Sequence, residues 1–406
     1  MSAPVAGAER IALLDVLRGF ALYGVLLANL VPWFTGRYFF PRTEVMARMT
    51  WADHGAIYLI SVLVDGKFQT LFSFLFGVGF AVQLGRAEAR GASGVTTYLR
   101  RLAILFVIGA CHVAFLWWGD VLWGYALTGV LLIVFRGRST RALLLWAAAL
   151  VLVPHLVSMI PAVADPIGKL VPHAHDRDAF KAQVLAALRG HDYGLLMRMQ
   201  VEHAITFVAP IAFWYHFWVL GRFLIGYVAG RSRRLHDAAD HLPFFRKLLV
   251  WGAGLGLPCA IAVTVLRVVR RSGTKIPLGV QIAAIAPEEI GAFSMAAAYV
   301  AAVVLLMQRP AWRARLMVLA PMGQMALSNY LAQSLMGAFL FYGWGLGLMG
   351  RVGPALCVPL SIVEFVVLLL ISRTWMRRFR FGPVEWVWRS LTYGRRQPML
   401  RTAGTA

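Results

Sequence analysis

A few ionisable side chains interrupt the long apolar stretches of this sequence, and these residues could do chemistry. A charge in hydrocarbon costs at least about 2.5 to 3.5 kcal/mol, so each needs a partner, a wet cavity or a function. Asp15 and Arg18 are three residues apart and share a helix face, and Asn29 returns to nearly that face about 16 Å farther along. Gly19 and Gly24 would let a neighbouring helix approach closely. The same residues could instead form a structural ion pair and a helix contact.

A histidine in a second apolar stretch is the strongest candidate for a general base. His112 lies eleven residues after Arg101. Eleven residues make about three helical turns, so the two side chains share one face of the helix. Histidine suits proton transfer near neutral pH. Asp120 could orient the imidazole, but about 12 Å of helical rise separates the two residues, so they meet only if the helix breaks at Gly119. The alternative is a histidine that makes an ordinary hydrogen-bonded helix contact.

Other polar residues within the apolar stretches are expected either to support the structure or to line a polar pathway through the bundle. Lys67 follows Asp65 closely and could pair with a carboxylate or extend to the membrane interface. Asn329 and Gln333 are four residues apart and share a helix face, so they could bond neighbouring helices or line a cavity.

The elements that position these residues are transmembrane helices. Of the 406 residues 60% are hydrophobic and only 14% charged, against about 25% charged in a soluble domain. A spanning helix needs about 20 apolar residues. The sequence therefore predicts an all-α, polytopic transmembrane bundle, a single domain over residues 1–406 without a separate soluble enzyme domain. About ten spans are expected, at 11–33, 66–84, 102–118, 121–135, 142–161, 204–229, 248–269, 290–308, 316–342 and 353–375.

The net charge of +22 is distributed unevenly among the loops. The loops on the side of the N-terminus carry most of the cations, and residues 376–406 form a basic tail. By the positive-inside rule both termini are predicted to be cytoplasmic. In a membrane protein this excess follows from topology, so we expect membrane lipids and no nucleic acid as partners.

Two outer segments are long enough to cover the membrane face. Residues 34–64 are expected to form a lid, with 55–64 as an interfacial or re-entrant helix. Residues 163–203 are expected to form one amphipathic helix on the outer surface. The His173/His175/Asp176 cluster there is unspecific, so no metal site is predicted. Walker, GxSxG, HExxH and dinucleotide motifs do not occur in a suitable strand–helix context, which argues against ATP-driven transport, serine hydrolysis, zinc proteolysis and nicotinamide chemistry.

Five blocks of the sequence resemble the YeiB family of bacterial inner-membrane proteins, a domain of unknown function. The resemblance covers the whole chain and implies a multi-pass protein of the inner (plasma) membrane. Gln324 departs from the family, which usually has Arg there. The blocks are 10–19 (RIALLDVLRG), 67–79 (KFQTLFSFLFGVG), 112–125 (HVAFLWWGDVLWGY), 323–333 (GQMALSNYLAQ) and 381–389 (FGPVEWVWR).

The Asp-x-x-Arg-Gly opening with Asn29 is also similar to the first helix of the heparan-glucosaminide acetyltransferases and, more distantly, to acyltransferase-3 proteins. This similarity implies acyl transfer from a cytoplasmic acyl-CoA to a glycan or lipid acceptor at the outer face. Asn29 would then hold the developing oxyanion, and His112 or His54 would deprotonate the acceptor. His112 ranks above His54 because the YeiB pattern contains the His112 and Asp120 block. The residues expected to attract the CoA phosphates are Arg18, Arg100, Arg101 and Arg222.

Two other function classes stay open from the sequence. The polar stripe of Asp15, Arg18, Asn29 and His112 could instead serve a transporter or flippase for a small anion or lipid. A non-catalytic membrane scaffold is the third reading. The sequence does not predict the acyl donor, the acceptor or the oligomeric state.

Overall fold

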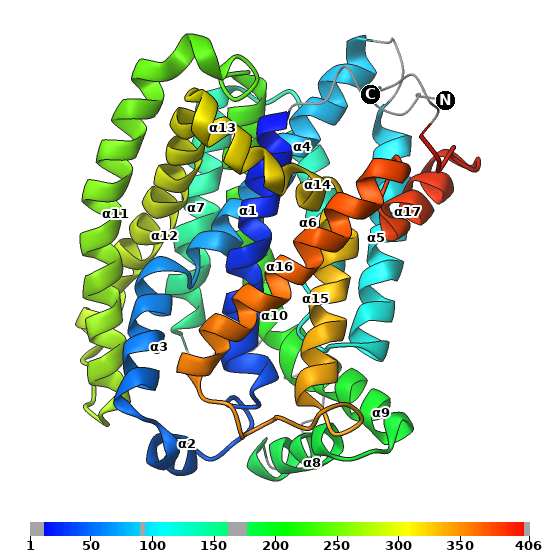
Figure 1. The fold of residues 1–406 in the computed structure, drawn as a ribbon. Coiled ribbons are helices and arrows are strands. Elements are labelled where there is room, and N and C mark those ends of the chain that lie inside the picture. Colours follow the sequence, from blue (N-terminus) through cyan, green and yellow to red (C-terminus); the bar gives the residue numbers. More distant parts are fainter. Residues whose placement is uncertain (1–11, 90–93, 161–176, 402–406) are drawn as a thin grey trace.

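The computed structural model describes residues 12–89, 94–160 and 177–401, which form a helical bundle without β-strands in these ranges (Figure 1). The all-helical prediction is thus confirmed. The helices along the bundle axis are α1 (Ala12–Asn29), α4 (Lys67–Ala89), α5 (Gly94–Phe115), α6 (Leu122–Leu132), α7 (Thr140–Ser158), α10 (Ala209–Arg231), α11 (Leu242–Arg271), α12 (Leu278–Met307), α15 (Ala326–Phe341) and α16 (Pro354–Arg378). Shorter helices are α2 (Arg42–Arg48), α3 (Trp51–Leu63), α8 (Arg177–Arg189), α9 (Tyr193–His203), α13 (Pro310–Leu316), α14 (Ala320–Gln324) and α17 (Pro383–Tyr393).

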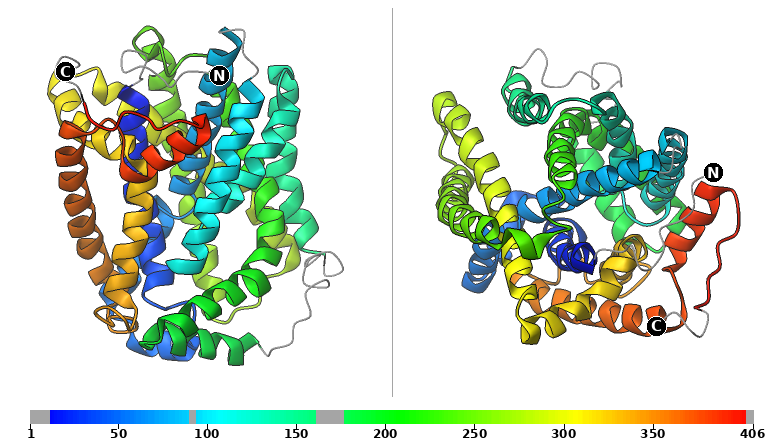
Figure 2. Two further views of the ribbon diagram at one scale, coloured as in Figure 1. Left: turned by 90° about the vertical axis from the view of Figure 1, so that its right-hand side faces the viewer. Right: turned by 90° about the horizontal axis from the view of Figure 1, so that it is seen from above.

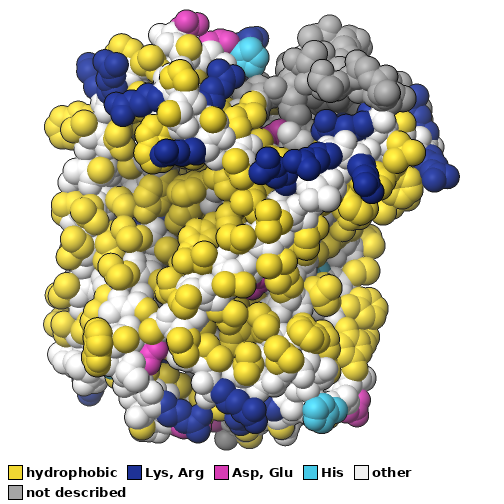
Figure 3. All heavy atoms as spheres, viewed as in Figure 1, with side chains coloured by type: hydrophobic (Ala, Val, Ile, Leu, Met, Phe, Trp, Pro, Cys, Tyr) yellow, Lys and Arg dark blue, Asp and Glu magenta, His cyan; other side chains and the backbone are white. Residues whose placement is uncertain are grey.

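The surface of the bundle fits a bilayer. Seven helices among the described residues are long and apolar enough to cross a membrane. The pair Tyr193–Val208 and Phe213–Arg231, bent by 78°, would add an eighth span, and Leu122–Phe135 is a shorter apolar helix. A broad apolar band separates basic side chains at the two ends of the molecule (Figure 3). These helices and this surface are those of a membrane protein.

Helix α1 lies at the centre of the bundle because glycines let other segments approach it. It packs against α4, α12, α14, α15 and α16. A Cβ atom at Gly323 of α14 would lie 1.8 Å from the carbonyl oxygen of Asp15, and one at Gly19 would lie 2.4 Å from that of Leu319. Close approach of the backbones fixes the depth of Asp15 and Arg18 relative to α14 and to the turn that precedes it.

The apolar stretch Trp51–Gly85 is divided into α3 and α4 by a turn at residues 64–66. Helix α3 begins at a capping box, in which the Thr50 side chain accepts from the Asp53 amide and the Asp53 carboxylate accepts from the Thr50 amide. It packs against α11 and α16. Gly66 has a φ of 77°, a conformation that favours glycine, and it redirects the chain into α4.

Two expected helices are each divided. The described part of the outer segment contains α8 and α9 instead of one helix, because Asp192 caps a new helix by accepting from the Leu195 amide. His173, His175 and Asp176 lie outside the described residues. The expected span 316–342 is interrupted at Met325, between α14 and α15.

The basic tail folds onto one end of the bundle. Helix α17 lies across that end against α5 and α15 (Figure 2). Behind it the chain returns along the end of α16, with an isolated bridge between Phe379 and Leu400. This placement brings tail side chains over the interior of the bundle.

Candidate functional site

A cavity of about 1770 Å³ follows α1 for most of its length, from Leu14 to Trp33. It exceeds the 300 to 1,000 Å³ typical of sites for drug-sized ligands. Asp15, Arg18 and Asn29 all line it, so the polar stripe faces one hollow. Arg18 donates to Asp15 at 3.0 Å. We call this cavity the passage.

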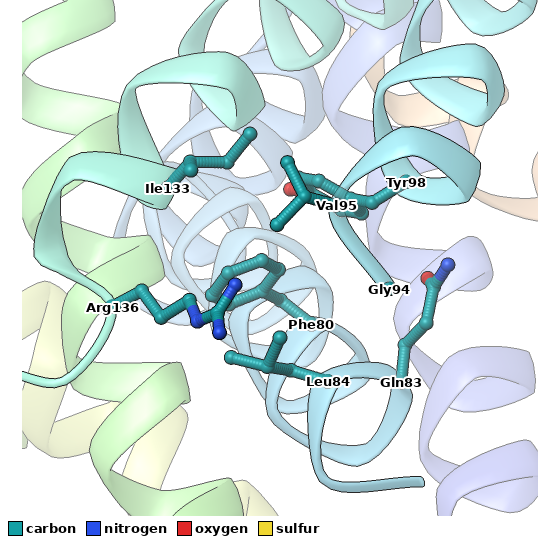
Figure 4. A pocket seen from close by; sticks show the side chains of 8 residues that line it. All are labelled: Phe80, Gln83, Leu84, Gly94, Val95, Tyr98, Ile133 and Arg136. Atoms are coloured by element: carbon teal, nitrogen blue, oxygen red, sulfur yellow. The ribbon is translucent and has the colours of Figure 1, made fainter. Parts of the chain in front are cut away.

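A second pocket lies beside the passage, between α4, α5 and the end of α6 (Figure 4). Its volume is about 10 Å³, room for no more than about one water molecule. Phe80, Gln83 and Tyr98 line both hollows. This pocket therefore adds nothing to the space in which a ligand could bind.

The end of the passage near α17 is strongly basic. Seven arginines from α1, α5 and the C-terminal tail line it, against the carboxylates of Asp15 and Glu385 at the same end. Together they can attract a multiply charged anion such as a phosphate group. The arginines are Arg18, Arg101, Arg380, Arg389, Arg395, Arg396 and Arg401.

Two contacts hold α17 over this basic end. The Glu385 carboxylate accepts from the amides of Leu327 at 2.7 Å and Ser328 at 3.1 Å, at the N-terminus of α15, where unpaired amides favour an anion. Burial nevertheless raises the pKa of Glu385 above its ordinary value. The Arg101 guanidinium stacks on the Trp388 ring at 4.0 Å, and the Trp388 indole donates to the Arg101 carbonyl at 2.8 Å. The tail is thus part of the wall of the passage.

His112 and Asp120 meet at the opposite end of the bundle because α5 ends at Phe115. The Nδ1 atom of His112 lies 2.7 Å from Oδ1 of Asp120, and the Trp123 amide donates to Oδ2 at 3.0 Å. The carboxylate is therefore fixed, and it favours the imidazole tautomer with hydrogen on Nδ1. The Nε2 atom of His112 is buried and has no hydrogen-bond partner among the described residues.

The turn between the two residues depends on glycine. A Cβ atom at Gly119 would lie 2.3 Å from the Trp117 ring, so a larger residue would displace the indole. Helix α5 ends at Phe115, four residues before the expected break at Gly119, and the turn that follows brings the imidazole and the carboxylate together.

Tyr330 connects this dyad to the passage. His112 itself does not line the passage, whereas Tyr330, Val121 and Leu122 do. The rings of Tyr330 and His112 are 5.3 Å apart, and the Tyr330 hydroxyl accepts from the Val121 amide at 3.3 Å. Tyr330 is a residue that the sequence analysis did not single out.

Arg222 is not at the basic end of the passage, contrary to the sequence prediction. It is fully buried, donates from Nη2 to Oε2 of Glu289 at 2.8 Å and from Nε to the Thr70 hydroxyl at 2.8 Å. Its guanidinium also stacks on the Trp218 ring. These contacts occupy the guanidinium, so a phosphate group has no access to it.

Other candidate residues lie away from the passage walls. His54, on α3, has its ring 6.2 Å from that of Tyr58 and tilted by 40°, and Arg100 is exposed beside Arg101. Neither residue lines the passage. Lys67 donates to the Ser61 carbonyl at 2.7 Å, which satisfies the end of α3.

Asn329 and Gln333 bond neighbouring segments. Asn329 donates to the Met322 carbonyl and the Ser372 hydroxyl, and Gln333 donates to the Leu22 carbonyl of α1. Both residues therefore connect α15 to its neighbours. No group of three His, Cys, Asp or Glu side chains that could hold a metal ion occurs in the described part of the chain.

Comparison with known proteins places the chain among proteins without an assigned activity. The family model "Protein of unknown function (DUF418)" matches residues 229–395. The chain is 33% identical to the uncharacterized protein YxaH of Bacillus subtilis, over 97% of this chain and 96% of that protein. It is 27% identical to the uncharacterized protein YeiB of Escherichia coli, over 98% of each. No solved structure matches. With this similarity along nearly its whole length, the chain belongs to the DUF418 family, which includes the YeiB proteins.

Proposed function

We propose that this protein is a transmembrane acyltransferase of the bacterial inner membrane. In this proposal the bundle crosses the bilayer about ten times with both termini in the cytoplasm. The basic end of the passage then faces the cytoplasm, where acyl-CoA is present, and the His112 end faces outward. The acyl group moves along the passage from one side to the other.

The dimensions of the passage support acyl-CoA as donor. The arm of CoA between its phosphates and its sulfur contains about twelve covalent bonds, as many as four extended residues, and so reaches about 14 Å. Arg18 and Asn29, which both line the passage, are eleven residues apart on α1, about 16 Å of helix. Phosphates bound by the arginines would therefore leave the thioester near Asn29.

The side chains near the outer end support nucleophilic attack on that thioester. Nε2 of His112 would take the proton of an acceptor hydroxyl or amine, whose oxygen or nitrogen forms a bond to the acyl carbon. The Asn29 amide would donate to the oxyanion. The carbon–sulfur bond then breaks, and the leaving CoA thiolate takes the proton from His112. Because Tyr330 contacts both the passage and His112, its ring must turn aside for this step.

The observation that carries the proposal is the His112–Asp120 pair, whose Nε2 has no partner among the described residues and whose imidazole lies against Tyr330 in the wall of the passage. The test is incubation of the purified protein in nanodiscs with radiolabelled acetyl-CoA, followed by measurement of label on protein, lipid or added glycan. We expect label transfer by the wild type and by His54→Ala, a control histidine outside the passage, and none by His112→Ala. Absence of CoA binding to the wild type would reject the proposal.

Transport is the second candidate function, and one observation favours it. The passage follows α1 along most of its length and also reaches the break between α3 and α4, and broken helices line the substrate sites of many transporters. Uptake of labelled substrate into proteoliposomes without a covalent product would favour this function over acyl transfer.

A further inference from the structure

The passage has a second polar region, at the break between α3 and α4. Asp65 and Gly66 in the turn, Gln69 on α4 and Arg267 on α11 line it. Arg267 donates from Nη2 to Oε1 of Glu288 on α12 at 2.5 Å, and its Nη1 lies 4.0 Å from Oδ2 of Asp65. Side chains from three separate segments thus form one charged cluster of Asp65, Arg267 and Glu288.

This cluster lies about one to three helical turns from the helix ends and is exposed. Glu288 is ten residues from the start of α12, about 15 Å along its axis, and Arg267 is four residues from the end of α11, about 6 Å. These positions are near the boundary between the headgroups and the hydrocarbon of a bilayer. The Asp65, Arg267 and Glu288 side chains are 41%, 36% and 43% exposed.

Large apolar side chains are exposed on the same helices. They are Leu63 on α3, Val265 on α11 and Ile290 on α12. Charges on a lipid-facing surface are expensive, so water or a polar headgroup must solvate this cluster. In Figure 3 acidic side chains show at points within the apolar band.

We propose that the charged cluster binds the headgroup of a zwitterionic phospholipid that carries a primary amine, at a lateral entrance to the passage. The Arg267 guanidinium matches the phosphate, and the Asp65 and Glu288 carboxylates match the ammonium group. The apolar surface of α3, α11 and α12 around the cluster accommodates the acyl chains. This binding goes beyond the proposed function and does not depend on acyl transfer.

The test uses photo-cross-linkable analogues of phosphatidylethanolamine, phosphatidylcholine and phosphatidylglycerol in nanodiscs that contain the full-length protein. Cross-linked peptides are identified by mass spectrometry. We expect phosphatidylethanolamine to label residues 58–69 and 261–271 several-fold more than the other two lipids. Arg267→Gln should reduce this labelling several-fold. Arg270→Gln, an exposed arginine on the same helix outside the passage, should leave it unchanged.

Equal labelling by the three lipids, or labelling that Arg267→Gln leaves intact, would overturn the inference. The comparison of lipids on the wild type needs no variant, so it decides the question even where Arg267→Gln does not fold. A failure of acyl transfer in the nanodisc assay rejects the proposed function and leaves the lipid result unaffected.

Discussion

The Arg222–Glu289 and His112–Asp120 pairs are both buried within the bundle. They differ in whether a side-chain nitrogen is left without a hydrogen bond. In the Arg222–Glu289 pair the guanidinium is bonded to Glu289 and Thr70 and stacked on Trp218. In the His112–Asp120 pair the carboxylate is bonded to His112 and Trp123, while Nε2 of His112 has no partner among the described residues. Burial alone does not distinguish these pairs. A pair whose hydrogen bonds are all made serves structure, whereas an imidazole with one unbonded nitrogen can take up a proton.

The first substitution tests the His112–Asp120 pair. Asp120→Asn should lower acyl transfer by about 10² or more, because the amide no longer favours hydrogen on Nδ1 of His112. The affinity for acyl-CoA should stay within about twofold of the wild type, since Asp120 is far from the arginines along the passage. Rates and KM measured in nanodiscs separate the two effects. A variant with wild-type turnover would show that Asp120 does not orient a base.

The second substitution tests the Arg222–Glu289 pair. Arg222→Ala should reduce the free energy of unfolding by about 3 to 5 kcal/mol, because the buried Glu289 carboxylate loses its guanidinium partner and keeps the Trp218 indole as a hydrogen-bond donor. The double variant Arg222→Met/Glu289→Leu should recover most of this stability. Thermal unfolding in detergent measures both. If Arg222→Ala unfolds like the wild type, the pair is not structural.

A third substitution narrows the passage between its two ends. Gly79 lines the passage, and a Cβ atom added there meets no atom within 4 Å. Gly79→Leu should therefore fill space without strain and weaken acyl-CoA binding by roughly tenfold, about 1.4 kcal/mol. Gly85→Leu on the same helix also adds a Cβ in open space but lies outside the passage, so it should bind acyl-CoA normally. Equal binding by both variants would place the ligand elsewhere.

The smallest effect is expected at Glu385, which attaches α17 to α15. Burial raises the pKa of this carboxyl in the folded protein, so its contribution to stability is fully present below its ordinary pKa and declines as the pH rises. Glu385→Gln does not titrate. The stability of the wild type relative to this variant should thus be greatest near pH 4 and fall toward pH 8, as thermal unfolding at several pH values would measure. A difference that does not depend on pH would contradict this account.

The sequence predicted the helical architecture well and the details of the site only in part. Apolar runs define membrane helices because of the length needed to cross a bilayer, but breaks such as the one at Met325, between α14 and α15, depend on tertiary packing. The meeting of His112 with Asp120 could be expected because Gly119 lies between them. The partner of Arg222 could not, because Glu289 is 67 residues away on another helix.

The role of the tail in the passage was also hidden in the sequence. The positive-inside rule explains basic residues near Arg389 without any ligand, so nothing in the pattern distinguishes topology from binding. The distinction comes from the contact of Glu385 with the start of α15, which brings α17 over the passage. Nothing in the sequence around Tyr330 indicates that its ring contacts the His112 ring, and only the structure shows this contact.

The most direct measurement compares the two pairs in one assay. Single-turnover transfer of radiolabelled acyl groups from acyl-CoA is followed in nanodiscs for His112→Gln and for Arg222→Met/Glu289→Leu. We expect no transfer by His112→Gln, although this variant folds and binds acyl-CoA, and transfer near the wild-type level by the double variant. Transfer by His112→Gln at the wild-type rate would contradict this expectation.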